Sequence, residues 1–316
     1  MLTQKDIQIL TIIVESGKVK ANFSLKNLTT MKIGGKADLY IQTADFEEVR
    51  EVFLYCRELK IPLFVLGGGS NIIFTDEGFA GVVLKLEPKP MKIDAKKNSV
   101  TLSAGYSANL AAVKLAEEGW SGFEGFFGLP GTIGGAIYMN SKWPKEYFQT
   151  SNILQGVTYL DNMGRIAERE VGEFKFAYGY SSFQEEKGII LSATFAIERA
   201  DPKKITEHNK EVMNYRQQTQ PVGAQTSGCV FKNISLEAAQ KRLLPTASAG
   251  YLIDKCGLKE TKMGKMMVSP IHANFFINLG GATSKEYLNL VNLVKNKVYE
   301  KFGINLEEEV EVIKIS

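Results

Sequence analysis

The sequence predicts an α+β protein of two domains, and three observations support this fold class. Helix-like and strand-like segments are interspersed along the 316 residues, a length that allows about two domains. Strand-like runs dominate before residue 200 and helical periodicity follows it, so a boundary is expected there. Nine of the 29 glycines lie in two loops, at 67–69 and 122–135, which indicates a specialised role for those loops.

The first 200 residues alternate between the two kinds of element. Residues 1–22 are predicted as an N-terminal helix. Apolar residues at steps of three and four predict an amphipathic helix over 45–60. A shorter helix is expected after Ser107, ending at Gly119. Strands are predicted at 38–42, 63–66, 72–74, 81–86, 99–103 and in three runs between 156 and 197.

The last third contains more helix. Helices are predicted at 203–218 and 249–256, and a long one follows Thr283, whose T-x-x-E pattern with Glu286 forms a capping box. Gly303 ends that helix. Strands are predicted at 229–233, 274–278 and 310–315.

Composition excludes several kinds of function. With 38 basic and 35 acidic side chains, the net charge of +3 leaves no electrostatic footprint for nucleic acid. Two histidines and three dispersed cysteines lack the spacing of a zinc site or a redox dithiol, so no metal is predicted. An odd number of scattered cysteines favours a reducing compartment, here the cytoplasm. No signal peptide or membrane span is expected.

The two glycine-rich loops indicate binding of an anion or a flat cofactor. Gly67–Asn71 lies between two strands and lacks the G-x-G-x-x-G spacing, so a Rossmann fold is not supported. Three glycines alone would suit a tight turn equally well. The six glycines between 122 and 135 need more than a turn, and a planar cofactor with a pyrophosphate accounts for both loops.

Seven segments carry a family resemblance. In order, NLTTMKIGG (27–35), LGGGSNIIFTDEGFAGV (66–82), GLPGTIGGAIYMN (128–140), SGCVFKN (227–233) and three C-terminal segments within 250–310 resemble motifs of the UDP-N-acetylenolpyruvoylglucosamine reductases, the MurB family. The match runs from about residue 22 to 313. The tyrosine-bearing loop of some members is absent, so the chain resembles the shorter type.

This resemblance implies a fold and a reaction. An FAD-binding domain of the vanillyl-alcohol-oxidase (PCMH) type would occupy 23–200, with subdomains about 23–86 and 87–200. A smaller α+β substrate domain would span 201–304, and the tail, 305–316, would return to the active site. Non-covalent FAD would be reduced by NADPH and would reduce UDP-N-acetylglucosamine enolpyruvate in the same pocket. The product, UDP-N-acetylmuramate, would feed peptidoglycan synthesis in the cytoplasm, and we expect a monomer without a membrane partner.

The resemblance also assigns residues. The catalytic residues would be Cys229, Glu309 and Tyr178. Substrate would be bound by Tyr178, Arg216, Lys232 and Asn233. FAD would be held by Ile33, Gly67, Gly68, Gly69, Ser70, Asn71, Gly128, Pro130, Gly131, Thr132, Gly134 and Gly135.

Three departures from the family pattern concern the chemistry. Cys229 stands where the family usually has a serine proton donor. A thiol, with an ordinary pKa near ~8.5, is mostly protonated at pH 7 and is a better acid than a hydroxyl. Glu309 aligns with the family's glutamate, and Glu311 stands where an arginine usually follows.

The third departure is Gly179, at the position of the family's arginine, which holds the substrate carboxylate. Lys175, Lys232 or Arg216 could replace its charge. Two alternatives stay open: a catalytically impaired homologue that binds FAD or the nucleotide sugar, and an FAD-linked oxidase. The oxidase is disfavoured because neither glycine-rich loop contains a histidine that could tether FAD. The one histidine near the motifs, His272, is expected to be structural.

Overall fold

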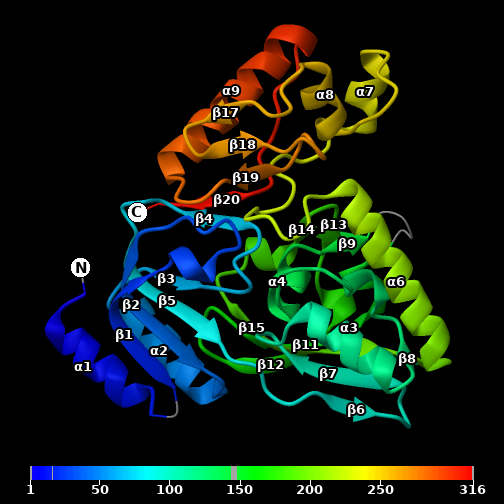
Figure 1. The fold of residues 1–316 in the computed structure, drawn as a ribbon. Coiled ribbons are helices and arrows are strands. Elements are labelled where there is room, and N and C mark those ends of the chain that lie inside the picture. The colour runs from blue at the N-terminus through cyan, green and yellow to red at the C-terminus, as the bar shows by residue number, and fades with distance from the viewer. Residues whose placement is uncertain (1, 16, 144–147, 315–316) are drawn as a thin grey trace. The chain divides into compact units, whose positions relative to one another are not determined.

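The computed structural model describes residues 2–15, 17–143 and 148–314 and divides the chain into two units (Figure 1). Unit 1 comprises Met1–Phe23, Ala37–Gly68 and Ala80–Tyr215. Unit 2 comprises Ser24–Lys36, Gly69–Phe79 and Arg216–Ser316. The chain passes from unit 1 to unit 2 within the first glycine-rich loop, between Gly68 and Gly69. The domain boundaries expected from the sequence stay a prediction.

Unit 1 begins with a four-stranded sheet in the order β1-β2-β5-β3. Two helices, α1 (Gln4–Ile13) and α2 (Phe46–Glu58), accompany this sheet. Asp45 caps α2 by accepting two backbone N–H bonds, and the helix buries Val49, Val52 and Cys56. The strands are β1 (Lys18–Ser24), β2 (Lys36–Thr43), β3 (Leu63–Val65) and β5 (Phe79–Leu86).

The N-terminal helix over 1–22 is wrong in extent. The helix ends at Ile13, and Lys18–Ser24 forms strand β1. Val19 and Phe23 are the half-buried positions in β1, and the residues between them are exposed, so burial in this stretch does not follow a regular period of two.

The second sheet of unit 1 has five strands in the order β12-β11-β15-β7-β6. Helices α3 (Ala108–Glu117) and α4 (Ile133–Tyr138) supply buried apolar residues to the same core, and α4 contacts β15 and β7. As predicted, Ser107 caps α3, and Gly119 follows its end with a φ of +75°. The strands are β6 (Lys92–Asp94), β7 (Ser99–Ser103), β11 (Leu154–Leu160), β12 (Ile166–Glu170) and β15 (Ile189–Ala196).

Short elements complete unit 1. A hairpin of β13 (Phe176–Ala177) and β14 (Tyr180–Ser181) carries the Tyr178–Gly179 turn. The long helix α6 (Pro202–Thr219) follows the second sheet and runs into unit 2. The others are β8 (Trp120–Ser121), β9 (Lys142–Trp143), β10 (Phe148–Gln149), α5 (Thr150–Ile153), β16 (Glu198–Arg199) and 3-10 turns at Glu124–Phe126, Val171–Glu173 and Ser182–Gln184.

Unit 2 is built around a three-stranded sheet, β17-β18-β19, with α9 (Ser284–Phe302) packed along it (Figure 1). Parallel pairing of β20 with β4 returns the C-terminal tail to this unit. The remaining elements are a 3-10 turn (Lys26–Leu28), β4 (Ile72–Phe74), α7 (Leu236–Lys241), α8 (Ala249–Lys255), β17 (Lys262–Met263), β18 (Met266–Val268), β19 (Phe276–Asn278) and β20 (Glu311–Ile313).

The strand predicted at 229–233 is wrong as a regular element. Only isolated bridges form there, from Cys229 to Phe275 and from Phe231 to Glu308. Each edge of this extended segment meets a different irregular stretch of chain, so no continuous ladder develops.

No helix in the described ranges is long and apolar enough to cross a membrane. The same ranges contain no group of three or more histidine, cysteine, aspartate or glutamate residues arranged to hold a metal ion.

Candidate active site

The segment that carries Cys229 is clamped along one edge by Asn274. The Asn274 side chain accepts the Phe231 N–H at 3.0 Å and donates to the Phe231 carbonyl at 2.8 Å. Its own carbonyl accepts the Val230 N–H at 2.8 Å. Because Asn274 is only 2% exposed, these bonds compete little with water and fix the backbone beside Cys229.

The C-terminal tail lies along the other edge of the same segment. The Glu309 N–H donates to the Val230 carbonyl, and the Lys232 N–H donates to the Glu307 carbonyl, both at 2.8 Å. The Glu309 backbone is therefore bonded to Val230, the residue next to Cys229. Cys229 and Glu309 are both partly exposed. Two residues predicted to act together, 80 positions apart in sequence, are neighbours in the fold.

The other glutamates of the tail have different surroundings. Glu307 is exposed and pairs with Lys232, and Glu308 pairs with Lys295 at 2.9 Å. Glu311 is exposed. Among these glutamates, Glu309 is the one whose backbone bonds to the residue next to Cys229, and its catalytic role stays a prediction.

Asn71 anchors the tail, a role that the sequence did not indicate. Its side-chain amide donates to the Glu309 carbonyl at 3.0 Å, and its own carbonyl accepts the Glu311 N–H at 3.1 Å. Asn71 was predicted to hold FAD, and that prediction stays untested. The bonds show that it also positions Glu309.

The two glycine-rich loops touch within unit 1. A Cβ added to Gly68 would lie 2.5 Å from the Gly131 Cα, and one added to Gly67 would lie 3.0 Å from the Thr132 Oγ1. Backbone therefore packs on backbone where any side chain would separate the loops. Such a bare, closely packed surface fits the flat ring system and pyrophosphate of FAD, so these residues suit the cofactor implied by the resemblance.

Glycines of the second loop serve packing more than anion binding. The N–H groups of Gly128, Gly134 and Gly135 donate to the Asn109 side chain, the Ala104 carbonyl and the Thr132 hydroxyl. A Cβ on Gly134 would lie 2.9 Å from the Ala104 Cβ. Since these donors are already used, shape is the main contribution of these three glycines to a cofactor site.

The Tyr178–Gly179 turn lies in unit 1, with Lys142 against it. The Tyr178 side chain is 45% exposed, and the Lys142 Nζ lies 2.9 Å from the centre of its ring. Gly179 has a φ of +61°, and a Cβ there would meet no atom of the described part of the chain within 4 Å. Sequence reasoning did not identify Lys142, because 36 positions separate it from Tyr178.

The remaining predicted residues have these surroundings. Arg216 is 6% exposed, and burial lowers the pKa of its guanidinium to about 10, so it stays charged at neutral pH.

Asn233 accepts the Ala249 N–H at the start of α8. Ile33 is 1% exposed in the core of unit 2, and Gly69 in the same unit has a φ of +65°. Ser70 is partly exposed, and Pro130 belongs to the second loop of unit 1.

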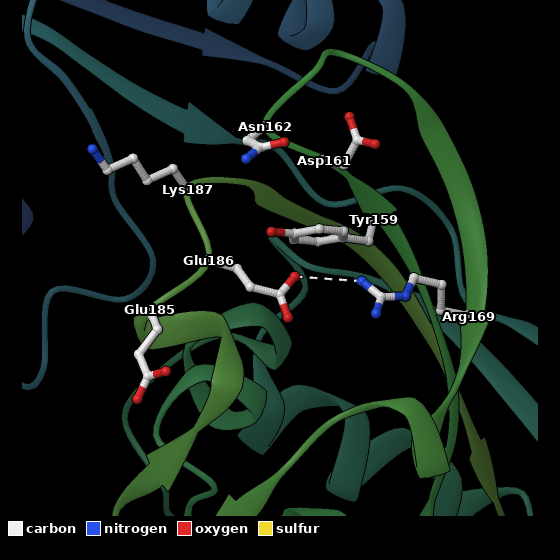
Figure 2. Close-up of a pocket in the computed structure, with 7 residues that line it drawn as sticks. All are labelled: Tyr159, Asp161, Asn162, Arg169, Glu185, Glu186 and Lys187. Carbon is white, nitrogen blue, oxygen red and sulfur yellow. Dashed lines mark hydrogen bonds and ion pairs between the residues drawn. The ribbon is translucent and has the colours of Figure 1, made fainter.

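A polar pocket of about 540 Å³ lies elsewhere in unit 1 (Figure 2). Tyr159 and Arg169 stand on neighbouring strands of the five-stranded sheet, and Arg169 pairs with Glu186 at 3.4 Å. The full lining is Tyr159, Asp161, Asn162, Arg169, Glu185, Glu186 and Lys187. None of the predicted site residues lines it, so no function is assigned to this pocket.

Comparison with known proteins identifies the family. Residues 220–313 match the model of the UDP-N-acetylenolpyruvoylglucosamine reductase C-terminal domain, and residues 37–169 match an FAD binding domain. A UDP-N-acetylenolpyruvoylglucosamine reductase of Protochlamydia amoebophila (strain UWE25) is 36% identical over 294 residues, 93% of each chain. One of Bacillus subtilis (strain 168) is 35% identical over 300 residues, 95% of each chain.

The chain belongs to the UDP-N-acetylenolpyruvoylglucosamine reductase family.

A solved structure supports this family assignment. The crystal structure of UDP-N-acetylenolpyruvylglucosamine reductase from Thermus caldophilus superposes with a TM-score of 0.76 at 30% identity, covering 94% of this chain and 98% of that one. The family resemblance and the predicted fold class, an FAD-binding domain followed by a smaller α+β domain, are thereby confirmed. Membership in the UDP-N-acetylenolpyruvoylglucosamine reductase family makes Gly179 the departure that most needs a structural explanation.

Proposed function

We propose that this chain is an FAD-dependent oxidoreductase that uses NADPH to reduce UDP-N-acetylglucosamine enolpyruvate to UDP-N-acetylmuramate, a step of peptidoglycan precursor synthesis. The observation that carries the proposal is the bonding of the Glu309 backbone to the residue beside Cys229. This backbone bond brings a thiol-bearing residue and a carboxyl-bearing residue close together in the fold, which suits a reaction in which one carbon gains a hydride and its neighbour gains a proton.

Each predicted site residue has a proposed role in this reduction. The loops 67–71 and 128–135 would hold FAD without a covalent bond, and the bound cofactor would supply the transfer of a hydride from NADPH to C3 of the enolpyruvyl group. Cys229 donates its thiol proton to C2. Glu309 hydrogen-bonds the enol form and helps to place that proton, and Tyr178, Arg216, Lys232 and Asn233 contact substrate.

NADPH and the nucleotide sugar use one pocket in turn, which suits a chain whose sequence has no separate nicotinamide motif. We further propose that the protein acts in the cytoplasm as a monomer. Its three scattered cysteines suit a reducing compartment.

A turnover assay tests the proposal. The FAD-loaded protein should oxidise one NADPH for each enolpyruvyl nucleotide reduced, with no consumption above background when the nucleotide is omitted. Flavin binding without turnover would instead indicate an impaired homologue. NADPH consumption that follows oxygen and ignores the nucleotide would indicate an oxidase. Either result would overturn the proposal.

A cysteine variant tests the proton donor. Cys229→Ala should lower nucleotide reduction by at least ~100-fold, the usual contribution of a positioned general acid. Flavin reduction by NADPH should be unaffected, because that step needs no proton from Cys229. Cys256→Ala is the matched control, since its thiol lies against the Lys297 carbonyl in α9, outside the proposed site. Normal turnover by Cys229→Ala would exclude the role.

A further inference from the structure

The Tyr178–Gly179 turn has space for a charged side chain but does not carry one. Gly179 adopts a φ of +61°, which L side chains rarely adopt, and a Cβ there would have no neighbour within 4 Å among the described residues. An arginine at this position would be strained in the backbone conformation that the turn has. A positive charge at this turn must therefore come from another part of the chain.

Lys142 brings a cation to the turn from the adjoining strand, β9. Its Nζ lies 2.9 Å from the centre of the Tyr178 ring, and that nitrogen is buried from solvent. Burying an ammonium is costly, and the negative face of an aromatic ring offsets part of the cost. Each charge interaction of such a desolvated cation is stronger than it would be in water.

Several bonds fix the chain before Lys142 to the hairpin that carries Tyr178. The Asn140 side chain donates to the Ala177 carbonyl at 3.0 Å, and the Ser181 hydroxyl donates to the Tyr138 carbonyl at 2.7 Å. The Gln184 amide bridges the Tyr138 and Gly179 carbonyls, at 2.9 and 3.1 Å. Asn140 is 1% exposed, so the connection is internal and sets where Lys142 can reach.

The next residue anchors β9 from its other side. Trp143 is 2% exposed and packs edge-to-face on Tyr215, with the ring centres 5.5 Å apart. Lys142 is thus held by a packed neighbour and by the bonded stretch before it. Packing and hydrogen bonds within unit 1 therefore fix the position of Lys142 at the turn.

We propose that Lys142 is the cation that binds the substrate carboxylate at the Tyr178–Gly179 turn. The inference rests on the proposed function, since the enolpyruvyl group carries that carboxylate. The ammonium also stabilises the negative charge that develops as the double bond is reduced. Lys175, which could also supply a charge, suits the role less well, because it is exposed and water screens its charge more than that of the buried Lys142 Nζ.

Substitution of Lys142 tests this with two ligands. Lys142→Met keeps the length of the side chain and removes its charge. In the FAD-loaded protein it should lower kcat/KM for the enolpyruvyl nucleotide by about 100-fold, the effect of losing one charge-stabilising donor. Calorimetric binding of the enolpyruvyl nucleotide should weaken by at least ~10-fold. Binding of UDP-N-acetylglucosamine, which lacks the carboxylate, should not change.

Two further variants separate charge from folding. Lys142→Arg retains the charge and should restore most of the turnover, whereas Lys142→Gln should behave like Lys142→Met. Lys203→Met, which removes an exposed lysine of α6, is the matched control and should behave like the wild type. If Lys142→Met slows flavin reduction by NADPH as much as nucleotide reduction, the role is structural and the inference is overturned.

Failure of this inference and failure of the proposed function would look different. If the wild type reduces the nucleotide and Lys142→Met binds and reduces it equally well, the role of Lys142 is overturned and the function stands. If the wild type neither binds nor reduces the nucleotide, both are overturned.

Discussion

Tyr287 lies in the core of unit 2 with a hydroxyl for which the described residues offer no hydrogen-bond partner. The side chain is 0% exposed and packs edge-to-face on Phe276, and burial raises the pKa of its phenol. A buried hydroxyl without a partner costs about 1–3 kcal/mol of desolvation. Tyr287→Phe should therefore leave the free energy of unfolding unchanged or raise it by up to ~1 kcal/mol in urea denaturation.

A second tyrosine of α9 provides the comparison. Tyr299→Phe changes a side chain that is 55% exposed and should have almost no effect on stability. Tyr287→Ala should cost about 3–5 kcal/mol, since it leaves a cavity. A loss of more than ~1 kcal/mol in Tyr287→Phe would mean that the hydroxyl is bonded in the folded protein.

His272 makes the stability of unit 2 depend on pH. Its Nδ1 accepts the Asn274 N–H at 3.2 Å, and burial, together with the positive charge of Lys259, lowers the pKa of its ring. Below pH ~6.5 the unfolded chain binds this proton before the folded protein does. Stability should therefore fall as the pH drops from ~6.5 to the lowered pKa, by at most ~1.4 kcal/mol per pH unit.

The test compares stability at pH 7.5 and pH 5.5. His272→Gln removes the titrating group, so the loss of stability between the two pH values should be smaller than in the wild type. His208→Gln, which removes the chain's other histidine, serves as the control. An unchanged pH dependence in His272→Gln would show that this ring does not contribute.

At the scale of elements, α9 depends on its two ends. The Thr283 hydroxyl accepts the Glu286 N–H at 3.1 Å, and the Glu286 carboxylate accepts the Thr283 N–H at 2.9 Å. Gly303 ends the helix with a φ of +63°. Thr283→Ala should lower the free energy of unfolding by about 1 kcal/mol in urea denaturation, because it leaves the first-turn N–H groups without this acceptor.

Thr283→Ser is the control for the cap, since it keeps a hydroxyl and should lose little stability. Gly303→Ala should separately lower the free energy of unfolding by ~1 kcal/mol, because alanine is strained in the left-handed conformation of this residue. If both alanine variants were as stable as the wild type, packing alone would hold α9 and the capping argument would be wrong.

The elements that the sequence predicted well are those with local signals. Both α2 and α9 carry an apolar stripe and a capping residue, so their limits follow from neighbours in sequence. Cys229–Asn233 reads as a strand, but its partners, Phe275 and Glu308, lie at least 46 positions away on irregular stretches. A local pattern cannot tell such isolated bridges from a regular ladder.

For the whole molecule, the same limit governs the site. The motifs identified the family, which is confirmed, whereas the roles of the glycine-rich loops, Cys229 and Glu309 stay predictions. Asn274 and Lys142 could not be selected, because their roles come from tertiary contacts with Phe231 and Tyr178. Nothing in a lysine's own sequence neighbourhood distinguishes one that lies on an aromatic ring from one on the surface.

Cofactor binding should affect the stability of the whole protein. A ligand that binds only the folded state raises the free energy of unfolding by about 2.7 kcal/mol at 100 times its Kd. FAD should therefore raise the Tm of the flavin-free protein in proportion to the logarithm of its concentration. In Gly68→Ala the new Cβ would lie 2.5 Å from the Gly131 Cα, so the loops must separate and the response to FAD should be lost.

Gly172→Ala is the matched control, because a Cβ there meets no atom of any described residue within 4 Å and its φ lies outside the left-handed region. Its Tm should rise with FAD as in the wild type. The decisive measurement is the shift in Tm across a series of FAD concentrations for the three proteins. An equal shift in Gly68→Ala and the wild type would mean that contact between the two glycine-rich loops is not needed to hold FAD.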